Sequence, residues 1–343
     1  MPNLYQSARH WVTMPMLISF VFLFSIPFWI KGAGLYQYLG VEILLWMIYA
    51  LGFNLLLGYT GLPSFGHGAY FGIGAYTFGL VQHHLAINVW LGLMGGVLAA
   101  SIAAALVALF ISHRRGIYFA LMTIAFGQVF WFAAVKWHSV TGGEDGLLDI
   151  PRPDALFFSL DSNTALFYFA FLFFIIVVIG LWRLIHSPFG KIIKAIKQNE
   201  MRAGFIGYNV RLYKFMVFVI SAAIAGLAGA LFSMAQQSAY PDVMSLHVSG
   251  YVVMMTLIGG GFVSFWGPVL GTAVFFLARD ILGAITHTWL LWYGLMFMAI
   301  VMFKPEGIAG IWQGLVARKS KPNEEDISPV TLKEASHGRN ASV

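Results

Sequence analysis

Long apolar runs, separated by short polar segments, follow one another along most of the chain. A helix of about 20 apolar residues is long enough to cross the hydrocarbon core of a bilayer. The pattern therefore predicts an all-α, polytopic membrane protein with about ten transmembrane or partly re-entrant helices. We place these passes at residues 11–31, 36–57, 62–82, 88–112, 116–136, 163–185, 213–237, 250–262, 266–282 and 289–303.

The composition agrees with this interpretation. Of 343 residues, 59% are hydrophobic and only 10% are charged, which is too little charge to cover the surface of a soluble protein. Cysteine is absent, and this excludes disulfides and thiolate metal sites. The first run, Trp11 to Ile30, contains Pro15 and Pro27 and lacks a clear cleavage site. We interpret it as a retained helix rather than a signal peptide.

The lysines and arginines are distributed unevenly between the two sides of the predicted passes. Cytoplasmic segments of membrane proteins carry an excess of these residues, so the bias predicts that both termini are cytoplasmic. The net charge of +6 reflects this bias and does not indicate a nucleic-acid partner. We divide the chain into a membrane domain, residues 1–317, and a polar, disordered cytoplasmic tail, residues 318–343. The predicted inside residues are Arg9, Arg114, Arg115, those of the stretch Arg183 to Lys214, Lys304, Arg318, Lys319, Lys321, Lys333 and Arg339; Lys31, Lys136 and Arg152 fall outside.

The stretch from Arg183 to Lys214 is the longest basic interruption in the chain, and its core is a predicted cytoplasmic loop at residues 186–212. Pro188 suits the first turn of a helix, and the pattern from Lys191 to Ala203 predicts a short amphipathic helix. Ile192, Ile193 and Ile196 share its apolar face, and Gly204, Gly207 and Asn209 end it. Such a helix either lies on anionic lipid headgroups or fits a cleft on a soluble partner.

An acidic segment falls on the opposite side of the membrane, at residues 137–162. It is either a docking surface for a soluble partner or a solvated connector. Glu144 and Asp145 are our candidates for docking. The segment also contains Asp149, Pro151, Pro153, Asp154 and Asp161.

Two stretches, Gly58 to Gly79 and Gly259 to Thr272, combine many glycines with a proline inside apolar sequence. Such backbone persists at membrane depth only where protein or a water-filled cavity satisfies it, so broken helices often mark a translocation route. The alternative is close helix packing through small residues. His67 in the first stretch either contacts the substrate or links two helices. The candidates for pathway or gate are Ser64, Gly66, His67, Gly68, Tyr70, Gly260, Gly261, Gly267 and Pro268.

Catalytic motifs are missing from the sequence. There is no HExxH, CxxC or GxSxG motif, and the Gly190-Lys191 pair is followed by Ile192, unlike in a Walker A motif. The sequence therefore predicts neither an enzyme nor an ATP-binding site. The few ionisable residues near the passes, Glu42, Arg279 and Asp280, fall close to the membrane boundaries. They do not form the carboxylate chain that proton-coupled carriers use.

Ordered segments between Leu51 and Gly310 resemble the LivM-like permease subunits of bacterial ABC importers for branched-chain amino acids. The likeness covers most of the chain. The segments are GYTGLPSFGHGAYFGIGAYT, GIYFALMTIAFGQVF, TGGEDGL followed by IPRP, SPFGKIIKAIKQNEMRAGFIGYNVRLYKF, AGLAGALF, GGGFVSFWGPVLGT and FKPEGIAG.

This resemblance implies an inner-membrane importer with a homologous LivH-like permease, two cytoplasmic ABC ATPases that hold ATP and Mg, and a periplasmic binding protein. This chain would bind no cofactor of its own. The family's coupling pattern falls on Glu200, Ala203 and Gly207, although Met201 and Arg202 replace the usual small residues. The implied ATPase-coupling residues are Pro188, Lys191, Lys194, Lys197, Glu200, Ala203 and Gly207.

Related permeases carry leucine, isoleucine and valine, but also urea, short amides and other amino acids, so the solute stays open. Two other classes remain as alternatives. An ion-coupled secondary carrier would work without ATPases, and a membrane-embedded enzyme would need a polar constellation that the sequence lacks.

Overall fold

The computed structural model describes residues 23–28, 32, 36, 38–85, 88–152, 160–304 and 306–311. Within these ranges the regular elements are helices, with one isolated β-bridge between Leu147 and Ala239, so the all-α prediction is confirmed. The helices are α3 (Tyr38–Thr60), α4 (Gly68–Leu85), α5 (Val89–Ile111), α6 (Gly116–Lys136), α7 (His138–Thr141), α8 (Asn163–His186), α9 (Pro188–Gln198), α10 (Glu200–Phe205), α11 (Val210–Gln236), η1 (Pro241–Met244), α12 (Leu246–Gly259), α13 (Gly267–Ile285) and α14 (Trp289–Phe303).

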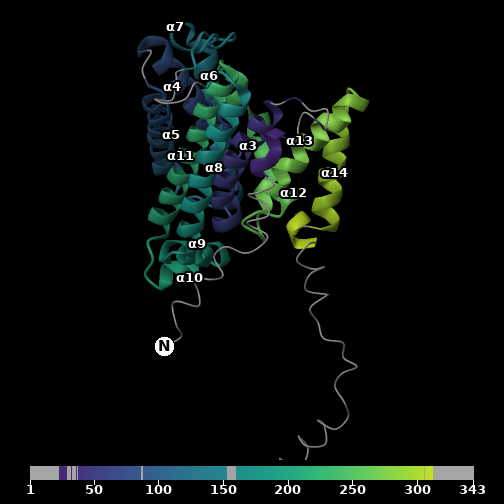
Figure 1. Ribbon diagram of the computed structural model, residues 1–343. Helices are drawn as coiled ribbons and strands as arrows, with labels where there is room; N and C mark the ends of the chain where they lie inside the picture. The colour runs from purple at the N-terminus through teal and green to yellow at the C-terminus, as the bar shows by residue number, and fades with distance from the viewer. Residues whose placement is uncertain are drawn as a thin grey trace, which may run out of the picture.

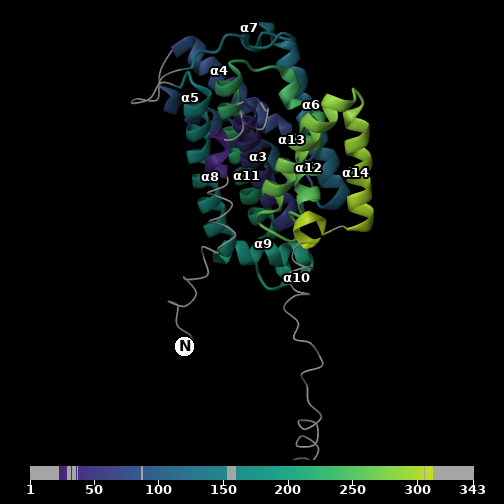
Figure 2. The ribbon, with the colours of Figure 1, turned by 45° about the vertical axis from the view of Figure 1, so that its right-hand side comes forward.

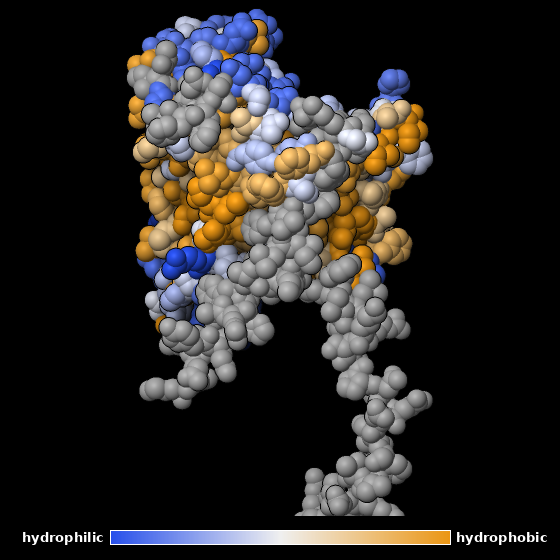
Figure 3. All heavy atoms as spheres, in the orientation of Figure 1, coloured by the Kyte–Doolittle hydropathy of each residue, from blue (hydrophilic) through white to orange (hydrophobic). Residues whose placement is uncertain are grey.

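Helices α3, α5, α6, α8, α11 and α13 are long and apolar enough to cross a membrane, whereas α12 and α14 are shorter apolar helices. On the face shown in Figure 3, a belt of apolar side chains crosses the molecule between more polar regions. The chain is therefore a multi-pass membrane protein. The count of ten passes and the cytoplasmic termini stay predictions. Most of the first predicted pass, part of the external loop and the whole polar tail lie outside the described residues.

Helix α3 forms the centre of the molecule. Of its most apolar window, 94% is buried, and its neighbours are α8, α9, α11, α12 and α13 (Figure 1). A helix that is apolar all round belongs inside a bundle, because it has no polar side to turn to water. Helix α14 is the opposite case, since Tyr293 is its one fully buried side chain. Movement of α3 must therefore move most of the membrane domain.

Helices α4, α5 and α11 pack closely through glycines. A Cβ atom at Gly74 of α4 would lie 2.0 Å from the carbonyl oxygen of Gly226 in α11, and one at Gly96 of α5 would lie 3.0 Å from that of Gly74. Gly229 of α11 lies against α4, where a Cβ would approach the Phe71 carbonyl oxygen to 1.8 Å. Small residues let helix backbones approach in this way, and van der Waals packing then holds the helices together in lipid.

Replacing Gly229 with alanine is expected to destabilise the permease by about 1–3 kcal/mol, because the added methyl group overpacks the α4–α11 contact. Gly180 of α8 provides a matched control, since a Cβ there would meet nothing within 4 Å. Alanine at Gly180 should leave the melting temperature in detergent unchanged or raise it slightly. Equal melting temperatures for the two variants would contradict the packing.

The two predicted loops lie at opposite ends of the molecule. Helices α9 and α10 form one end, and α7 with the segment that follows it forms the other (Figures 1 and 2). This is the arrangement that a cytoplasmic loop at residues 186–212 and an external loop at residues 137–162 require.

Candidate functional site

The basic loop folds into two helices rather than one. Ser187 accepts a hydrogen bond from the Gly190 amide, and Pro188 occupies the first turn of α9. The predicted single helix from Lys191 to Ala203 is wrong, because the chain turns to an extended conformation at Asn199. The Asn199 side chain accepts a hydrogen bond from the Arg202 amide at 2.9 Å and so begins α10. The predicted glycine turn is present, with Gly207 at a φ of +100°.

The apolar face of α9 packs on the protein. Ile193 and Ile196 are buried, and α9 contacts α3, α8 and α11. A helix that lies on headgroups would instead turn this face to the acyl chains. The packing therefore disfavours the lipid-surface interpretation of α9 and favours a helix mounted on the membrane domain.

Two lysines of α9 bind the end of α3. The Lys197 ammonium donates a hydrogen bond of 2.6 Å to the Gly58 carbonyl oxygen and lies 4.8 Å from the ring of Phe262, in the turn between α12 and α13. Lys194 lies over the Tyr59 ring at 5.4 Å. Cations are favourable at the C-terminal end of a helix, and partial burial lowers the pKa of Lys197. A recess of about 450 Å³ at this junction is lined by Gly58, Tyr59, Lys194, Lys197, Gln198, Gly261, Phe262 and Val263.

Glu200 at the start of α10 points inward. Its Oε1 lies 3.1 Å from the ammonium of Lys214, whose side chain is fully buried. Lys214 also donates to the carbonyl oxygen of Arg114, between α5 and α6. The predicted coupling residue Glu200 therefore holds α10 against α11 and the α5–α6 connection. We find Ala203 buried next to it, and Lys191 exposed.

Large apolar side chains project from α10 and the turn after it. Phe205 is 89% exposed, Ile206 70% and Met201 61%. We name these three residues the apolar knob. Beside it lies a recess of about 360 Å³ lined by Ala195, Gln198, Asn199, Arg202, Ala203, Ile206 and Tyr208. The sequence analysis did not select Phe205 or Ile206, although large apolar residues between glycines in a basic loop were a visible signal.

The first glycine-rich stretch is enclosed by helices. A Cβ at Gly66 would lie 1.8 Å from the Thr123 carbonyl oxygen of α6, and the Gly68 amide donates to Ser249 of α12 at 2.8 Å. Ser64 and Tyr70 are also buried. The predicted pass at residues 62–82 begins later than expected, because residues 61–67 are not helical and α4 starts at Gly68.

His67 lies in the centre of this stretch and is fully buried. Its Nε2 is 3.0 Å from the Ser221 hydroxyl of α11, which donates to the Gly52 carbonyl oxygen of α3 at 2.7 Å. The hydroxyl therefore accepts the hydrogen bond from Nε2–H. The imidazole also stacks on Tyr49 with an interplanar angle of 10°. This is the geometry that the helix-linking alternative for His67 requires.

The second stretch is a close hairpin. A Cβ at Gly259 would lie 1.8 Å from the Gly267 carbonyl oxygen, and Gly260 turns the chain with a φ of +84°. Pro268 is buried in the first turn of α13, and Gly261 lines the recess of about 450 Å³ beside Lys194 and Lys197. Helix α12, with 14 residues, is too short to span a bilayer alone. In this conformation the packing alternative accounts for both stretches, and their role in a pathway stays a prediction.

The charged residues Glu42 and Arg279 form a half-buried pair between α3 and α13. The guanidinium of Arg279 in α13 donates to both carboxylate oxygens of Glu42 in α3, at 2.9 and 3.0 Å. It also bonds Asp280 and Tyr36, and lies over the Phe276 ring at 4.5 Å. The sequence placed these residues near membrane boundaries but did not pair them. The bidentate contact fastens α13 to the central helix.

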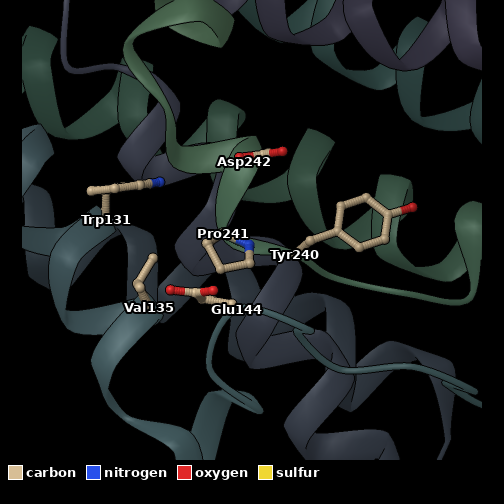
Figure 4. Close-up of a pocket in the computed structure, with 6 residues that line it drawn as sticks. All are labelled: Trp131, Val135, Glu144, Tyr240, Pro241 and Asp242. Carbon is tan, nitrogen blue, oxygen red and sulfur yellow. The ribbon is translucent and has the colours of Figure 1, made fainter.

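The opposite end carries the acidic segment. Glu144 and Asp145 are exposed, and Arg152 anchors the segment by a hydrogen bond of 3.2 Å to the Met234 carbonyl oxygen. Pro153 and Asp154 lie outside the described residues. A recess of about 280 Å³ opens at this end (Figure 4), lined by Trp131, Val135, Glu144, Tyr240, Pro241 and Asp242.

Comparison with known proteins agrees with this architecture. The high-affinity branched-chain amino acid transport system permease proteins LivM of Escherichia coli and Salmonella typhimurium are 27% and 26% identical to this chain over 288 residues. Each alignment covers 77% of this chain and 68% of the relative. The probable LivM permease of Methanocaldococcus jannaschii is 23% identical over 319 residues, covering 78% and 92%. No solved structure matches.

The family model for the permease component of branched-chain amino acid transport systems matches residues 36–304. This range holds α3 to α14 and includes α9, α10, both glycine-rich stretches and the acidic segment. Members of the family are transport components rather than enzymes. The chain therefore belongs to the family of branched-chain amino acid transport permeases.

Proposed function

We propose that this chain is one of two homologous permeases in an ATP-driven importer of the bacterial inner membrane, and that it carries branched-chain amino acids. A LivH-like permease completes the membrane part, a periplasmic binding protein delivers the solute, and two cytoplasmic ATPases bind ATP and Mg. This chain contributes no cofactor site. The observation that carries the proposal is the α9–α10 pair, which is fixed to the membrane domain on one side and presents the apolar knob on the other.

The apolar knob supports an ATPase contact at this end. Phe205 ends α10 and Ile206 follows it, and α9 and α10 lie at one end of the molecule (Figure 1), so both side chains suit contact with a soluble subunit. Burying a side chain of this size against a partner contributes about 1.5–3 kcal/mol. A helical pair with an exposed aromatic and a recess at its side therefore fits a cleft on a soluble subunit.

Two polar links connect the ATPase contact with the membrane domain. Lys197 joins α9 to the end of α3 and to the α12–α13 turn. The pair of Glu200 and Lys214 joins α10 to α11. ATP binding on the partners would shift α9 and α10 together, and these links would pass the shift to α3 and α11. Access then alternates between the two sides of the membrane by rigid-body movement.

The acidic segment fits a contact with the binding protein. It lies at the end opposite the apolar knob, so a protein docked there would not compete with the ATPases (Figure 1). Glu144 and Asp145 are exposed and can pair with basic residues of that protein. Contacts of this kind mainly steer association and fix the register of the two proteins.

The experiment is uptake of labelled leucine into vesicles that contain both permeases, the ATPases and the binding protein. We expect uptake that needs ATP hydrolysis and stops when any one subunit is omitted. An excess of isoleucine or valine should compete, whereas urea or acetamide should not. Competition by urea alone would change the assigned solute but leave the assignment as an ATP-driven importer intact. Uptake by this chain alone, driven by a proton or sodium gradient, would show a secondary carrier and overturn the proposal.

A further inference from the structure

Helix α6, which is long enough to cross a membrane, carries an amide side chain near its midpoint. Gln128 lies two residues beyond Phe126, the midpoint of α6, and its side chain is exposed. Within the described part of the chain it has no hydrogen-bond partner. An amide in contact with acyl chains is strongly unfavourable, because nothing there replaces its hydrogen bonds to water.

The neighbouring helix shows what a lipid-facing surface of this protein looks like. At a similar depth α5 exposes Leu98, Ile102 and Leu106, all of them aliphatic. Apart from Tyr118 and Lys136 near its ends, the exposed large side chains of α6 are apolar as well, with Leu121 and Phe132 among them. Leu121 and Phe132 lie at i−7 and i+4 from Gln128 and so on the same stripe of the helix. Gln128 therefore interrupts an otherwise apolar stripe, and the flank of α6 around it needs a polar environment.

That flank leads to the recess at the external end. Gln128, Trp131 and Val135 are spaced i, i+3 and i+7, so they follow one side of α6. Trp131 and Val135 line the recess of about 280 Å³ (Figure 4). With a rise of about 1.5 Å per residue, the Gln128 amide lies about one helical turn deeper than Trp131. The recess and the Gln128 amide therefore lie along the same side of α6.

We propose that this flank of α6 borders the translocation route and that Gln128 contacts the transported solute. The inference rests on the proposed function and adds a residue to it. A neutral amide offers both a donor and an acceptor, so it can bind the carboxylate and the ammonium of a zwitterion without adding net charge. Trp131 and Val135 offer apolar contact to an aliphatic side chain, and Glu144 and Asp242 at the mouth attract the ammonium.

The cysteine-free chain permits a direct test of water access. Gln128→Cys and the control Ile102→Cys would be exposed to a charged, membrane-impermeant methanethiosulfonate reagent in vesicles containing the complete importer. We expect rapid modification of Gln128→Cys and none of Ile102→Cys. Solute-loaded binding protein should slow the modification. If both positions resist the charged reagent, or if Gln128→Cys reacts at a rate that the solute does not change, the proposal is overturned. A disulfide or cross-link from this position to the partner permease would make it an interface residue and also overturn it.

Transport by Gln128→Leu gives a second readout, because leucine at an exposed membrane position should not impair folding. We expect half-maximal uptake to need about tenfold more solute-loaded binding protein, the effect of one lost hydrogen bond. ATPase binding should be unchanged. Unchanged uptake overturns the role of Gln128. The thiol test does not depend on ATP, so water access at residue 128 is measurable even if ATP-driven uptake is not found, and the two failures are distinguishable.

Discussion

Replacing Phe205 with alanine is expected to weaken binding of the ATPase to the permease by about 30-fold, the loss that corresponds to about 2 kcal/mol at an aromatic hot spot. Phe205 is the most exposed large apolar side chain of the apolar knob, and it contributes little to the fold of the free permease. The loss should therefore appear in the affinity for the ATPase, measured by titration of purified ATPase onto permease in lipid nanodiscs.

Phe132 provides the matched control for this substitution. It is 58% exposed in the last turns of α6, away from α9 and α10. Phe132→Ala should bind the ATPase with the affinity of the unchanged permease, and both variants should keep its melting temperature. A similar loss of affinity for both variants, or for neither, would show that the apolar knob is not the ATPase contact.

The second large effect concerns the ion pair that holds α10. Glu200→Ala leaves the fully buried Lys214 ammonium with the Arg114 carbonyl oxygen as its remaining hydrogen-bond partner in the described part of the chain. Removing one partner of a buried ion pair lowers the free energy of unfolding by about 3 kcal/mol or more, because the other partner stays buried with an uncompensated charge. We expect Glu200→Ala to lower the melting temperature and to loosen α10, and hence to reduce ATP-driven uptake.

A second substitution identifies the cause of this loss. The substitution Lys214→Met removes the unpaired buried charge but keeps most of the side-chain volume. The double variant Glu200→Ala/Lys214→Met should therefore regain most of the lost stability. Arg202→Ala, an exposed change on the same helix, should leave the melting temperature unchanged. A double variant no more stable than Glu200→Ala would mean that the pair does not fasten α10.

Much of the helical framework could be predicted because the bilayer sets the length of a crossing segment. Apolar runs predicted α6 and α8 nearly to the residue. Other boundaries depend on contacts with distant parts of the chain. The start of α4 at Gly68 follows from the fit of Gly66 against Thr123, which the sequence of one segment does not contain.

The presence of a helix in the basic loop was predictable, but the contacts of its residues were less so. Basic residues and Pro188 indicated a cytoplasmic helix, and the structure has a helix, α9, that begins at Pro188. The break at Asn199 was missed because an asparagine within a helical pattern can either continue the helix or cap a new one. We expected Glu200 to contact the ATPase, whereas in the structure its carboxylate pairs with Lys214, fourteen positions along the chain. Partners at such separations are fixed by tertiary packing, as they are for Glu42 and Arg279.

The central claim is that the apolar knob couples the ATPases to this permease. The most direct measurement is the rate of leucine uptake into vesicles as the concentration of ATPase is increased. The rate is compared for the unchanged permease, Phe205→Ala and Phe132→Ala. We predict that Phe205→Ala needs about 30-fold more ATPase for half-maximal uptake and then approaches the same maximal rate, since only docking is weakened. If the three curves coincide, the ATPases act elsewhere and the account of coupling through α9 and α10 is wrong.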